Sequence, residues 1–370
     1  SERKVLHGLA VFAGGCTLTA AEAVCADESV QTAEVIDVLA HLVDKSLVVA
    51  DQTADSTRYR LLETIRQYAL AKLQVAGDLA GVSARHCAFF VAWAEQAAAH
   101  LNGSNQLAWL DGYAAEHDNL RAAARWASAS HYGEPALRLA AALWRFWEVR
   151  GDFTEGRQWL EEALGAAGAA LPAVRAEAHL GAGTLAWHQA RYDQSLVHNK
   201  TALVLFQELH DEQGVALALN HVGVQLLFQQ EFAAAAAFLE QSLALAKTLN
   251  NKWVMIYALH NLGEIARHQE DYTNAARQYG AALALAQELD DAWATSIQLI
   301  WLGVVTRQLG HFAQAGAYLT QSMAIIRQLD DKEHTVECLE GFAGLAAAQG
   351  QTDKAVHLWS AADTLRQSIE

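Results

Sequence analysis

The chain has 370 residues and contains only two prolines, Pro135 and Pro172, while 52% of its residues are hydrophobic, mainly alanine and leucine. This composition favours helix almost throughout and allows two domains or one extended repeat array. The net charge of −16 at pH 7 excludes a phosphate-binding surface spread over the molecule, and no apolar run reaches the roughly 18 residues of a membrane span.

The four cysteines, Cys16, Cys25, Cys87 and Cys338, lie far apart in the sequence and form no Cys-x-x-Cys pair. Reduced thiols in the core of a cytoplasmic protein are the simplest interpretation, with a disulfide or a zinc site as the alternatives. The chain begins with Ser1 inside a helical pattern, so we expect it to be a fragment of a longer protein.

The first 75 residues predict three short helices, a β-hairpin and one more helix. The helices are expected at residues 6–13, 19–25, 32–44 and 63–73, and the strands at 46–50 and 57–62, around a polar turn rich in aspartate. Three helices followed by a hairpin are the order of a winged-helix domain, which we place at residues 1–78.

Winged helices often bind DNA, so the charge of this region is informative. Residues 1–75 contain seven Lys and Arg against ten Asp and Glu. The helix that would enter a DNA groove carries Glu34, Asp37 and Asp44 with a single lysine. Because phosphate contact needs clustered positive charge, direct DNA binding by this fragment is not expected.

After a predicted helical linker at residues 79–132, the rest of the chain repeats with a period of 40 residues. Positions in one register are Gly183, Gly223, Gly263 and Gly303; Tyr192, Phe232, Tyr272 and Phe312; Asp211, Asn251, Asp291 and Asp331; and Ser195, Ala235, Ala275, Ala315 and Ala355. A degenerate copy at residues 143–163 and a last copy with Ala343 in the glycine position make six units.

Each unit predicts two helices joined by a short turn, such as residues 254–268 followed by a second helix that contains Ala275, Tyr279 and Ala282. One such hairpin cannot bury its apolar face alone, whereas stacked neighbours bury a continuous core. The expected fold is therefore mainly all-α. A winged-helix domain with a small β-hairpin is followed, over residues 133–370, by an α-α superhelix of about six hairpins.

The order Leu-Gly, Tyr, Ala, aromatic, Ala resembles the tetratricopeptide repeat (TPR), here lengthened to 40 residues. In that family the first helix of each hairpin lines a concave groove that binds ligands. The resemblance places this groove on five positions of each first helix: Glu177, Leu180, Thr184, Trp187 and His188; Leu217, Asn220, Val224, Leu227 and Phe228; Tyr257, His260, Glu264, Arg267 and His268; and Ile297, Ile300, Val304, Arg307 and Gln308. The spacing agrees, because such positions share one helix face.

Several motifs in a fixed order resemble a larger family. They are "LAVFAGGCTLTAAEAV", "LVDKSLV", "YRLLETIRQYAL", "EHDNLRAAARWA", "LWRFWEVRGDFTEGRQWLEEAL" and "HLWSAADTLRQSI". These motifs are similar to those of signal-transduction ATPases with numerous domains (STAND). Among them, the motifs are similar to those of bacterial members that join an NB-ARC-type ATPase to a TPR sensor. Many of these are transcriptional regulators. The resemblance covers nearly the whole chain.

In that family the winged helix closes on the nucleotide site and holds the ATPase in an inactive, ADP-bound form. Relatives use a Met-His-Asp motif, which matches Leu61-Leu62-Glu63 here. Because leucine cannot hydrogen-bond a phosphate, Arg66 or a hydrophobic contact would have to replace the histidine. The alternative is that these leucines only pack the last strand.

The sequence contains no Gly-x-x-x-x-Gly-Lys-Ser/Thr phosphate loop, no His-Glu-x-x-His zinc helix and no Gly-x-Ser-x-Gly nucleophile elbow. His260 and Glu264 share a helix face, but zinc needs three or four converging ligands. We therefore expect a non-catalytic fragment without a metal or cofactor, and ATP or ADP on an ATPase domain upstream of Ser1. An enzyme that uses the histidine, glutamate and arginine side chains of the groove is the third alternative.

The candidate ligand site is an apolar floor with a few directed polar groups, which suits a peptide, a partner helix or a sugar-like ligand. Its residues are Trp187, His188, Asn220, Leu227, Phe228, Tyr257, His260, Glu264, Arg267, His268 and Arg307. A solvated helix face is the alternative. A second aromatic group, Trp144, Phe146, Trp147, Phe153 and Trp159, is interpreted as core rather than as a ligand cage.

The leading hypothesis is a regulatory fragment in which an inducer (a protein, peptide or small molecule) binds the TPR groove and relieves autoinhibition of the upstream ATPase domain. The alternative is a stand-alone TPR adaptor that docks a protein partner. No membrane partner is expected in either case.

Overall fold

The computed structural model describes residues 1–52, 57–101, 105–129, 133–167 and 171–368. Contacts divide the chain into two compact units. The first comprises Ser1–Ala98, Asp111–Ala142 and Glu162–Ala170, and the second comprises Ala99–Leu110, Leu143–Glu161 and Leu171–Glu370.

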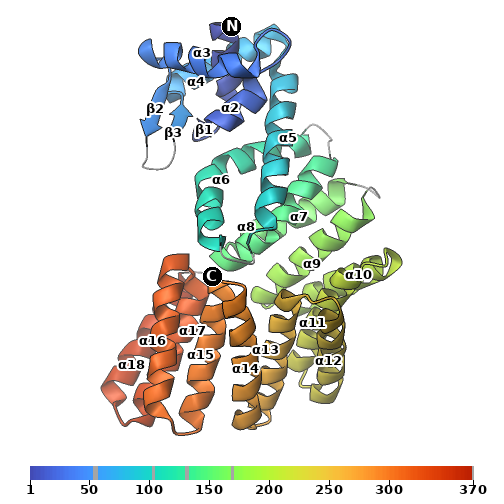
Figure 1. Ribbon diagram of the computed structural model, residues 1–370, viewed down its shortest axis with the longest axis vertical. Helices are drawn as coiled ribbons and strands as arrows, with labels where there is room; N and C mark the ends of the chain where they lie inside the picture. Colours follow the sequence, from blue (N-terminus) through green and yellow to red (C-terminus); the bar gives the residue numbers. More distant parts are fainter. Residues whose placement is uncertain (53–56, 102–104, 130–132, 168–170, 369–370) are drawn as a thin grey trace. The chain divides into compact units, whose positions relative to one another are not determined.

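The beginning of the first unit is a small helical domain with a three-stranded sheet (Figure 1). Its elements are α1 (Glu2–Gly8), a 3-10 turn (Leu9–Val11), β1 (Cys16–Thr17), α2 (Leu18–Cys25), α3 (Thr32–Asp44), β2 (Val49–Gln52), β3 (Thr57–Arg60) and α4 (Glu63–Ala76). The antiparallel sheet has the order β1-β3-β2. Three helices, a hairpin and a further helix confirm the predicted winged-helix fold.

Three details differ from the prediction for this domain. The first helix begins at Glu2 and gives way to a 3-10 turn at Leu9. After this turn, Gly14 and Gly15 (φ +83° and +90°) turn the chain toward β1. The two-residue strand β1 has no sequence signal of its own. The strand expected from residue 46 begins at Val49, since Ser46, which follows the C-cap Lys45 of α3, has a φ of +57° and is not extended. The predicted polar turn extends over residues 53–56, which lie outside the described residues.

Four helices follow: α5 (Leu79–Ala98), α6 (Gln106–Ala129), α7 (Gly133–Arg150) and α8 (Phe153–Ala166). Residues of α6, α7 and α8 belong partly to the first unit and partly to the second. The aromatic side chains of the α7–α8 segment lie in the core: Trp144, Phe146, Trp147 and Phe153 are buried, and Trp159 is half-buried.

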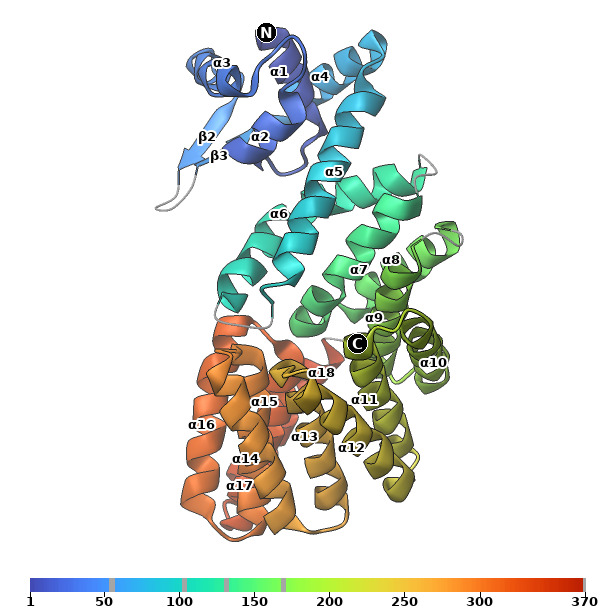
Figure 2. The ribbon, with the colours of Figure 1, turned by 45° about the vertical axis from the view of Figure 1, so that its right-hand side comes forward.

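The second unit continues as ten helices that begin every 20 residues and pack in antiparallel pairs (Figures 1 and 2). They are α9 (Pro172–His188), α10 (Tyr192–Glu208), α11 (Glu212–Phe228), α12 (Phe232–Thr248), α13 (Lys252–His268), α14 (Tyr272–Glu288), α15 (Ala292–Gln308), α16 (Phe312–Leu329), α17 (Lys332–Ala348) and α18 (Thr352–Gln367). With α7 and α8 as the degenerate copy, this confirms the predicted superhelix of hairpins.

Caps and small residues explain the regular period. Residues in the left-handed region end the helices at 20-residue intervals, and at the first of them the Arg191 amide donates to the Ala186 carbonyl over 2.9 Å. Asp211, Asn251, Asp291 and Asp331 cap the following first helices with their side-chain oxygens.

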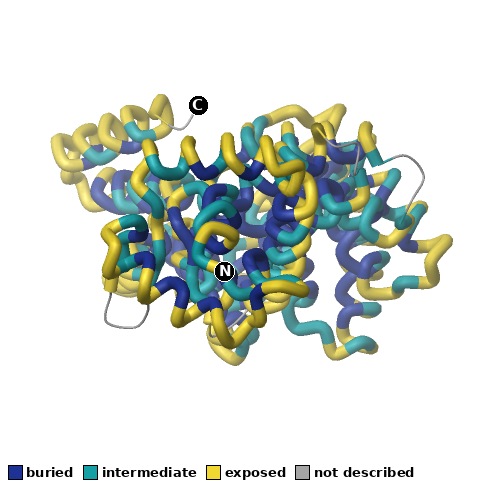
Figure 3. The backbone as a smooth tube through the Cα atoms, turned by 90° about the horizontal axis from the view of Figure 1, so that it is seen from above, coloured by how far each residue is buried: buried dark blue, intermediate teal, exposed yellow. Residues whose placement is uncertain are grey.

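The glycines of the repeat allow the two helices of a hairpin to approach closely. A Cβ added at Gly263 would lie only 2.7 Å from the Tyr279 ring, and one at Gly223 would lie 2.7 Å from Leu239. Figure 3 shows buried and exposed positions alternating along the helices, whereas α18, beside the C-terminus, is exposed along most of its length.

Candidate ligand-binding cavity

A cavity of about 550 Å³ lies between the first helices of the hairpins in the second unit. Its walls come mainly from α9, α11, α13, α15 and α17, with Glu148 contributed by α7. Five successive hairpins therefore present side chains to one common space. The volume falls within the range of small-molecule sites, which measure roughly 300–1,000 Å³.

The structure brings ten of the eleven predicted groove residues to this cavity. They are Trp187, His188, Asn220, Leu227, Phe228, Tyr257, His260, Glu264, Arg267 and His268. Arg307 is the exception. Its guanidinium carbon would lie 3.3 Å from a Cβ at Gly344, so this side chain lies against α17 instead of lining the cavity.

The lining also includes charged and aromatic side chains that the sequence analysis did not select: Glu148, Trp293, Trp301, Glu333, His334 and Glu337. The repeat register contained a signal for one of them. A further step of 40 residues from the predicted groove position Ile297 leads to Glu337. The predicted groove positions stopped one repeat before the helix that carries Glu337.

Aromatic rings form much of the cavity wall. Trp187 packs edge-to-face against Phe228, with ring centroids 5.4 Å apart. Trp293 and Trp301 contribute further rings, and the face of Trp301 carries the Arg267 guanidinium at 4.9 Å from the ring centroid. Such walls offer contact area to the apolar part of a ligand.

His188 connects two carboxylates across the cavity. Its Nδ1 lies 3.1 Å from Oε1 of Glu333 on α17, and its Nε2 lies 3.7 Å from Oε1 of Glu148 on α7. Burial would lower the pKa of His188, but the two carboxylates outweigh burial and raise it to about 10. The imidazole is therefore protonated at neutral pH and acts as the cation of this cluster.

Further ion pairs surround the cavity. Arg145 pairs with Glu148, and its guanidinium lies 4.2 Å from the ring centroid of Trp293. Burial opposes ionisation of Glu148, yet Arg145 and His188 hold the pKa of its carboxyl well below the usual value. On α13, Arg267 contacts the Glu264 carboxylate at 2.7 Å.

On α17, the Asp331 carboxylate lies 2.7 Å from Nδ1 of His334. Burial alone would lower the pKa of His334, but Asp331 and the nearby glutamates raise it to about 10. By contrast, burial dominates at His260, whose pKa is lowered and whose Nδ1 contacts Gln298 Oε1 at 3.2 Å. His334 is thus a cation and His260 is neutral.

Several buried polar atoms of the lining have no hydrogen-bond partner within the described residues. They are Nε1 of Trp187, Oη of Tyr257, Oδ1 of Asn199, Oε2 of Glu333 and Oε2 of Glu337. A buried polar atom without a partner costs free energy. The cavity therefore holds both donors and acceptors that a bound molecule could satisfy.

Of the four described carboxyls that line the cavity, Glu337 is the one whose pKa is raised, whereas the pKa values of Glu148, Glu264 and Glu333 are lowered. Burial raises its pKa to about 7; His334 opposes this shift, whereas Glu333, Glu264 and Asp331 add to it. A carboxyl in this state changes its charge close to neutral pH.

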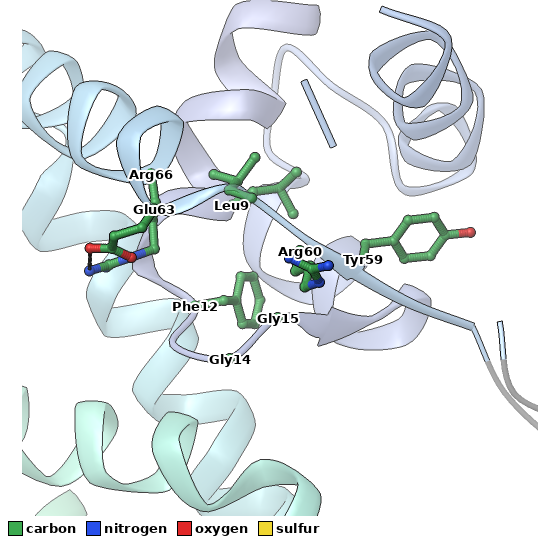
Figure 4. A pocket seen from close by; sticks show the side chains of 9 residues that line it. Leu9, Phe12, Gly14, Gly15, Tyr59, Arg60, Glu63 and Arg66 are labelled. Carbon is green, nitrogen blue, oxygen red and sulfur yellow. Dashed lines mark hydrogen bonds and ion pairs between the residues drawn. The ribbon is translucent and has the colours of Figure 1, made fainter. Parts of the chain in front are cut away.

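A smaller cavity of about 260 Å³ lies in the winged-helix domain, near the segment that corresponds to the Met-His-Asp motif (Figure 4). Arg66 lines it but is already engaged, since Nε lies 2.8 Å from Oε2 of Glu63 and Nη1 donates to the Ala10 carbonyl at 3.3 Å. Leu62 is 46% exposed and therefore does not pack in the core.

The helix α3 of the winged-helix domain differs in its charge. Glu34, Asp37 and Asp44 of α3 are exposed, so this helix presents negative charge. Among the described residues, no cluster of three or more His, Cys, Asp or Glu is placed to hold a metal ion, and no helix is long and apolar enough to cross a membrane. The four cysteines are buried and unpaired with one another.

Comparison with known protein families agrees with this architecture. Residues 1–74 match the winged helix-turn-helix domain family, and residues 258–292 match the tetratricopeptide repeat family. The chain contains a winged helix-turn-helix domain and tetratricopeptide repeats.

Relatives and structures of similar fold extend this result. A predicted HTH-type transcriptional regulator, found in Mycobacterium tuberculosis and Mycobacterium bovis, is 36% identical over 256 residues, which are 67% of this chain and 28% of the relative. The chain thus spans little more than a quarter of the length of these relatives.

Two solved structures share the fold. A STAND protein with a TPR sensor from Pyrococcus horikoshii matches with a TM-score of 0.52 at 13% identity, over 99% of this chain and 60% of that protein. A Rap protein complexed with the competence and sporulation factor matches with a TM-score of 0.55 at 14% identity, over 75% of this chain and 77% of that protein.

Proposed function

We propose that this chain is the non-catalytic sensor part of a transcriptional regulator, and that its TPR cavity binds an inducer. The observation that carries the proposal is the cavity of about 550 Å³, lined by aromatic rings and by polar atoms without partners. Similarity to predicted HTH-type transcriptional regulators supports the regulatory role. The Rap structure in complex with the competence and sporulation factor supports a ligand in such a fold.

We further propose that the longer protein is a STAND ATPase with its nucleotide site upstream of the winged-helix domain. The STAND protein of similar fold supports this arrangement. An inducer can shift such a regulator only if it binds the active arrangement more tightly than the inactive one. Binding in the cavity would then relieve autoinhibition of the ATPase.

A thermal-shift screen of the chain with cationic, neutral and anionic small molecules and short peptides tests the sensor role. We expect some compounds to raise the melting temperature of the wild type and of Trp359→Ala, a control at an exposed tryptophan on α18, but not of Trp187→Ala. If no compound distinguishes Trp187→Ala from the control, the cavity is not the ligand site.

The nucleotide part of the proposal has a separate test. Titration of ATP and ADP against this chain should give no tight binding, because the chain contains no phosphate loop. Tight nucleotide binding by this chain alone would contradict the placement of the nucleotide site upstream.

A further inference from the structure

Most of the charged groups around the TPR cavity are paired. Each cation has its own carboxylate partner: Arg145 with Glu148, His188 with Glu333, His334 with Asp331, and Arg267 with Glu264. Glu337 also lines the cavity, but its Oε2 is buried without a hydrogen-bond donor among the described residues. Asp291, which acts on Arg145, also has a buried Oδ2 without a partner among the described residues, but it does not line the cavity. Of the described carboxyls that line the cavity, Glu337 is therefore the one without a cation partner of its own.

The charged groups that act on Glu337 supply no cation of its own, because each of them belongs to an ion pair. The charged groups that act on it are His334 and Glu333 of α17, Asp331 at the N-terminus of that helix, and Glu264 of α13. Three of these four are carboxylates. An anionic ligand would be repelled here, a neutral one would leave the charge of Glu337 uncompensated, and a cationic one would neutralise it.

The aromatic wall is compatible with a cation that carries an apolar body. Trp293 and Trp301 already accept guanidinium groups of Arg145 and Arg267 on their faces, at 4.2 and 4.9 Å from the ring centroids. Trp187 and Phe228 add apolar surface in the same cavity. A cavity of about 550 Å³ admits a small organic molecule or the end of a short peptide.

We infer that the inducer of the TPR cavity carries a protonated amine, with Glu337 as its counter-ion and the aromatic wall in contact with its apolar part. This inference rests on the proposed sensor function. The amine belongs either to a small molecule or to the free N-terminus of a peptide, since both present the same ammonium group. The Glu333 carboxylate, whose Oε2 also lacks a partner, can accept a second hydrogen bond from the ammonium.

Isothermal titration calorimetry with charge-matched probes tests this assignment on the intact chain. The small-molecule probes are 2-phenylethylamine, 2-phenylethanol and 3-phenylpropionate, and the peptide probes are a tetrapeptide Phe-Leu-Ala-Ala with a free and with an acetylated N-terminus. In one of the two series, we expect the probe with a free amine (2-phenylethylamine or the unacetylated tetrapeptide) to bind at least tenfold more tightly than the uncharged or anionic probes of that series. The series that binds identifies the source of the amine.

Glu337→Gln is the decisive variant because it removes the charge and almost preserves the shape of the side chain. It should reduce amine affinity to that of the uncharged probe, while the matched control Glu240→Gln, at an exposed glutamate of α12, keeps the wild-type preference. The unliganded Glu337→Gln chain should melt at or above the wild-type temperature, because an uncompensated buried carboxyl is lost. A purely structural role of Glu337 would instead lower the melting temperature.

The possible outcomes separate this inference from the sensor proposal. Equal or tighter binding of the alcohol, the acid or the acetylated peptide overturns the amine assignment and leaves a ligand-binding TPR cavity. An amine preference that survives in Glu337→Gln overturns the role of Glu337. If none of these probes binds, the amine assignment also fails, while compounds that bind in the wider thermal-shift screen would still support the sensor function.

Discussion

Nδ1 of His188 lies 3.1 Å from Oε1 of Glu333, although 145 residues separate them in the sequence. This contact joins α9 to α17, the first helices of the first and the fifth regular hairpins. Hairpins of a solenoid ordinarily contact only their neighbours. Here the cavity places an ionic contact between hairpins that are four repeats apart, so ligand binding and the stability of the repeats share residues.

Removal of the imidazolium should destabilise the repeats. In His188→Ala the carboxylates of Glu148 and Glu333 lose their shared cation, and breaking a buried ion pair in this way costs about 3 kcal/mol. Urea denaturation measures the change in the free energy of unfolding. The control His357→Ala, at an exposed position of α18, should change it by less than about 0.5 kcal/mol.

A double-mutant cycle of His188→Ala and Glu333→Gln separates the contact from general effects of mutation. The two changes should couple, because the second removes one of the charges that the first leaves unpaired. Strict additivity would show that the 3.1 Å contact contributes nothing to stability.

The same histidine predicts a pH dependence of stability. The folded-state pKa of His188, about 10, lies above the unfolded value near 6.5, so its contribution is complete below about pH 6.5 and is lost as the pH rises toward 10. The difference in unfolding free energy between the wild type and His188→Gln should therefore shrink over this range. His334 titrates in the same direction but is present in both chains and cancels. A difference that is constant from pH 6 to 10 would contradict the ion-pair assignment.

Much of the repeat architecture was predictable because its determinants are local. The capping position shared by Asp211 and Asp291 and the close-contact position of Gly263 recur every 40 residues, and each acts within one hairpin or between neighbours. Of the twenty positions on the five-position stripe, which came from spacing and the family resemblance, thirteen line the cavity.

The closure of the cavity was not predictable in the same way. The contact of Glu333 with His188 depends on the rotation added by each of four repeats, and small per-repeat rotations are not encoded in residue spacing. Arg307, by contrast, was predicted to line the cavity but does not. It occupies the correct stripe position, but Gly344 leaves room for its guanidinium against α17.

Two glycines of one hairpin should respond to alanine in opposite directions. Gly263→Ala places a Cβ 2.7 Å from the Tyr279 ring, and overpacking of this kind costs about 1–3 kcal/mol. Gly280→Ala lies inside α14 with no atom within 4 Å, so it should stabilise the chain by up to about 1 kcal/mol through helix propensity. Thermal denaturation of both variants shows whether each substitution raises or lowers the melting temperature. Equal effects of both substitutions would contradict the close helix approach.

The winged-helix domain should not bind duplex DNA through α3. Glu34, Asp37 and Asp44 are exposed on that helix, and phosphate contacts require released counterions and therefore clustered lysine or arginine. Fluorescence anisotropy with labelled random-sequence duplexes should show no binding in the micromolar range at physiological salt. Binding that weakens steeply with salt would show that another basic surface of the chain contacts DNA.

Ligand binding should be linked to a proton at Glu337. The pKa of its carboxyl, raised by burial to about 7 in the unliganded chain, will fall when an ammonium group compensates the negative charge. Near pH 6.5 a large fraction of the carboxyl is protonated, so amine binding must release protons there and must strengthen as the pH rises through 7.

Calorimetry with 2-phenylethylamine in buffers of different ionisation enthalpy measures this release directly. In Glu337→Gln the release should disappear, whereas in Glu240→Gln it should persist, because the amide cannot titrate and the exposed glutamate lies outside the cavity. Proton release of the same size in Glu337→Gln would assign the linkage to another group of the cavity, and the amine would then have a different counter-ion.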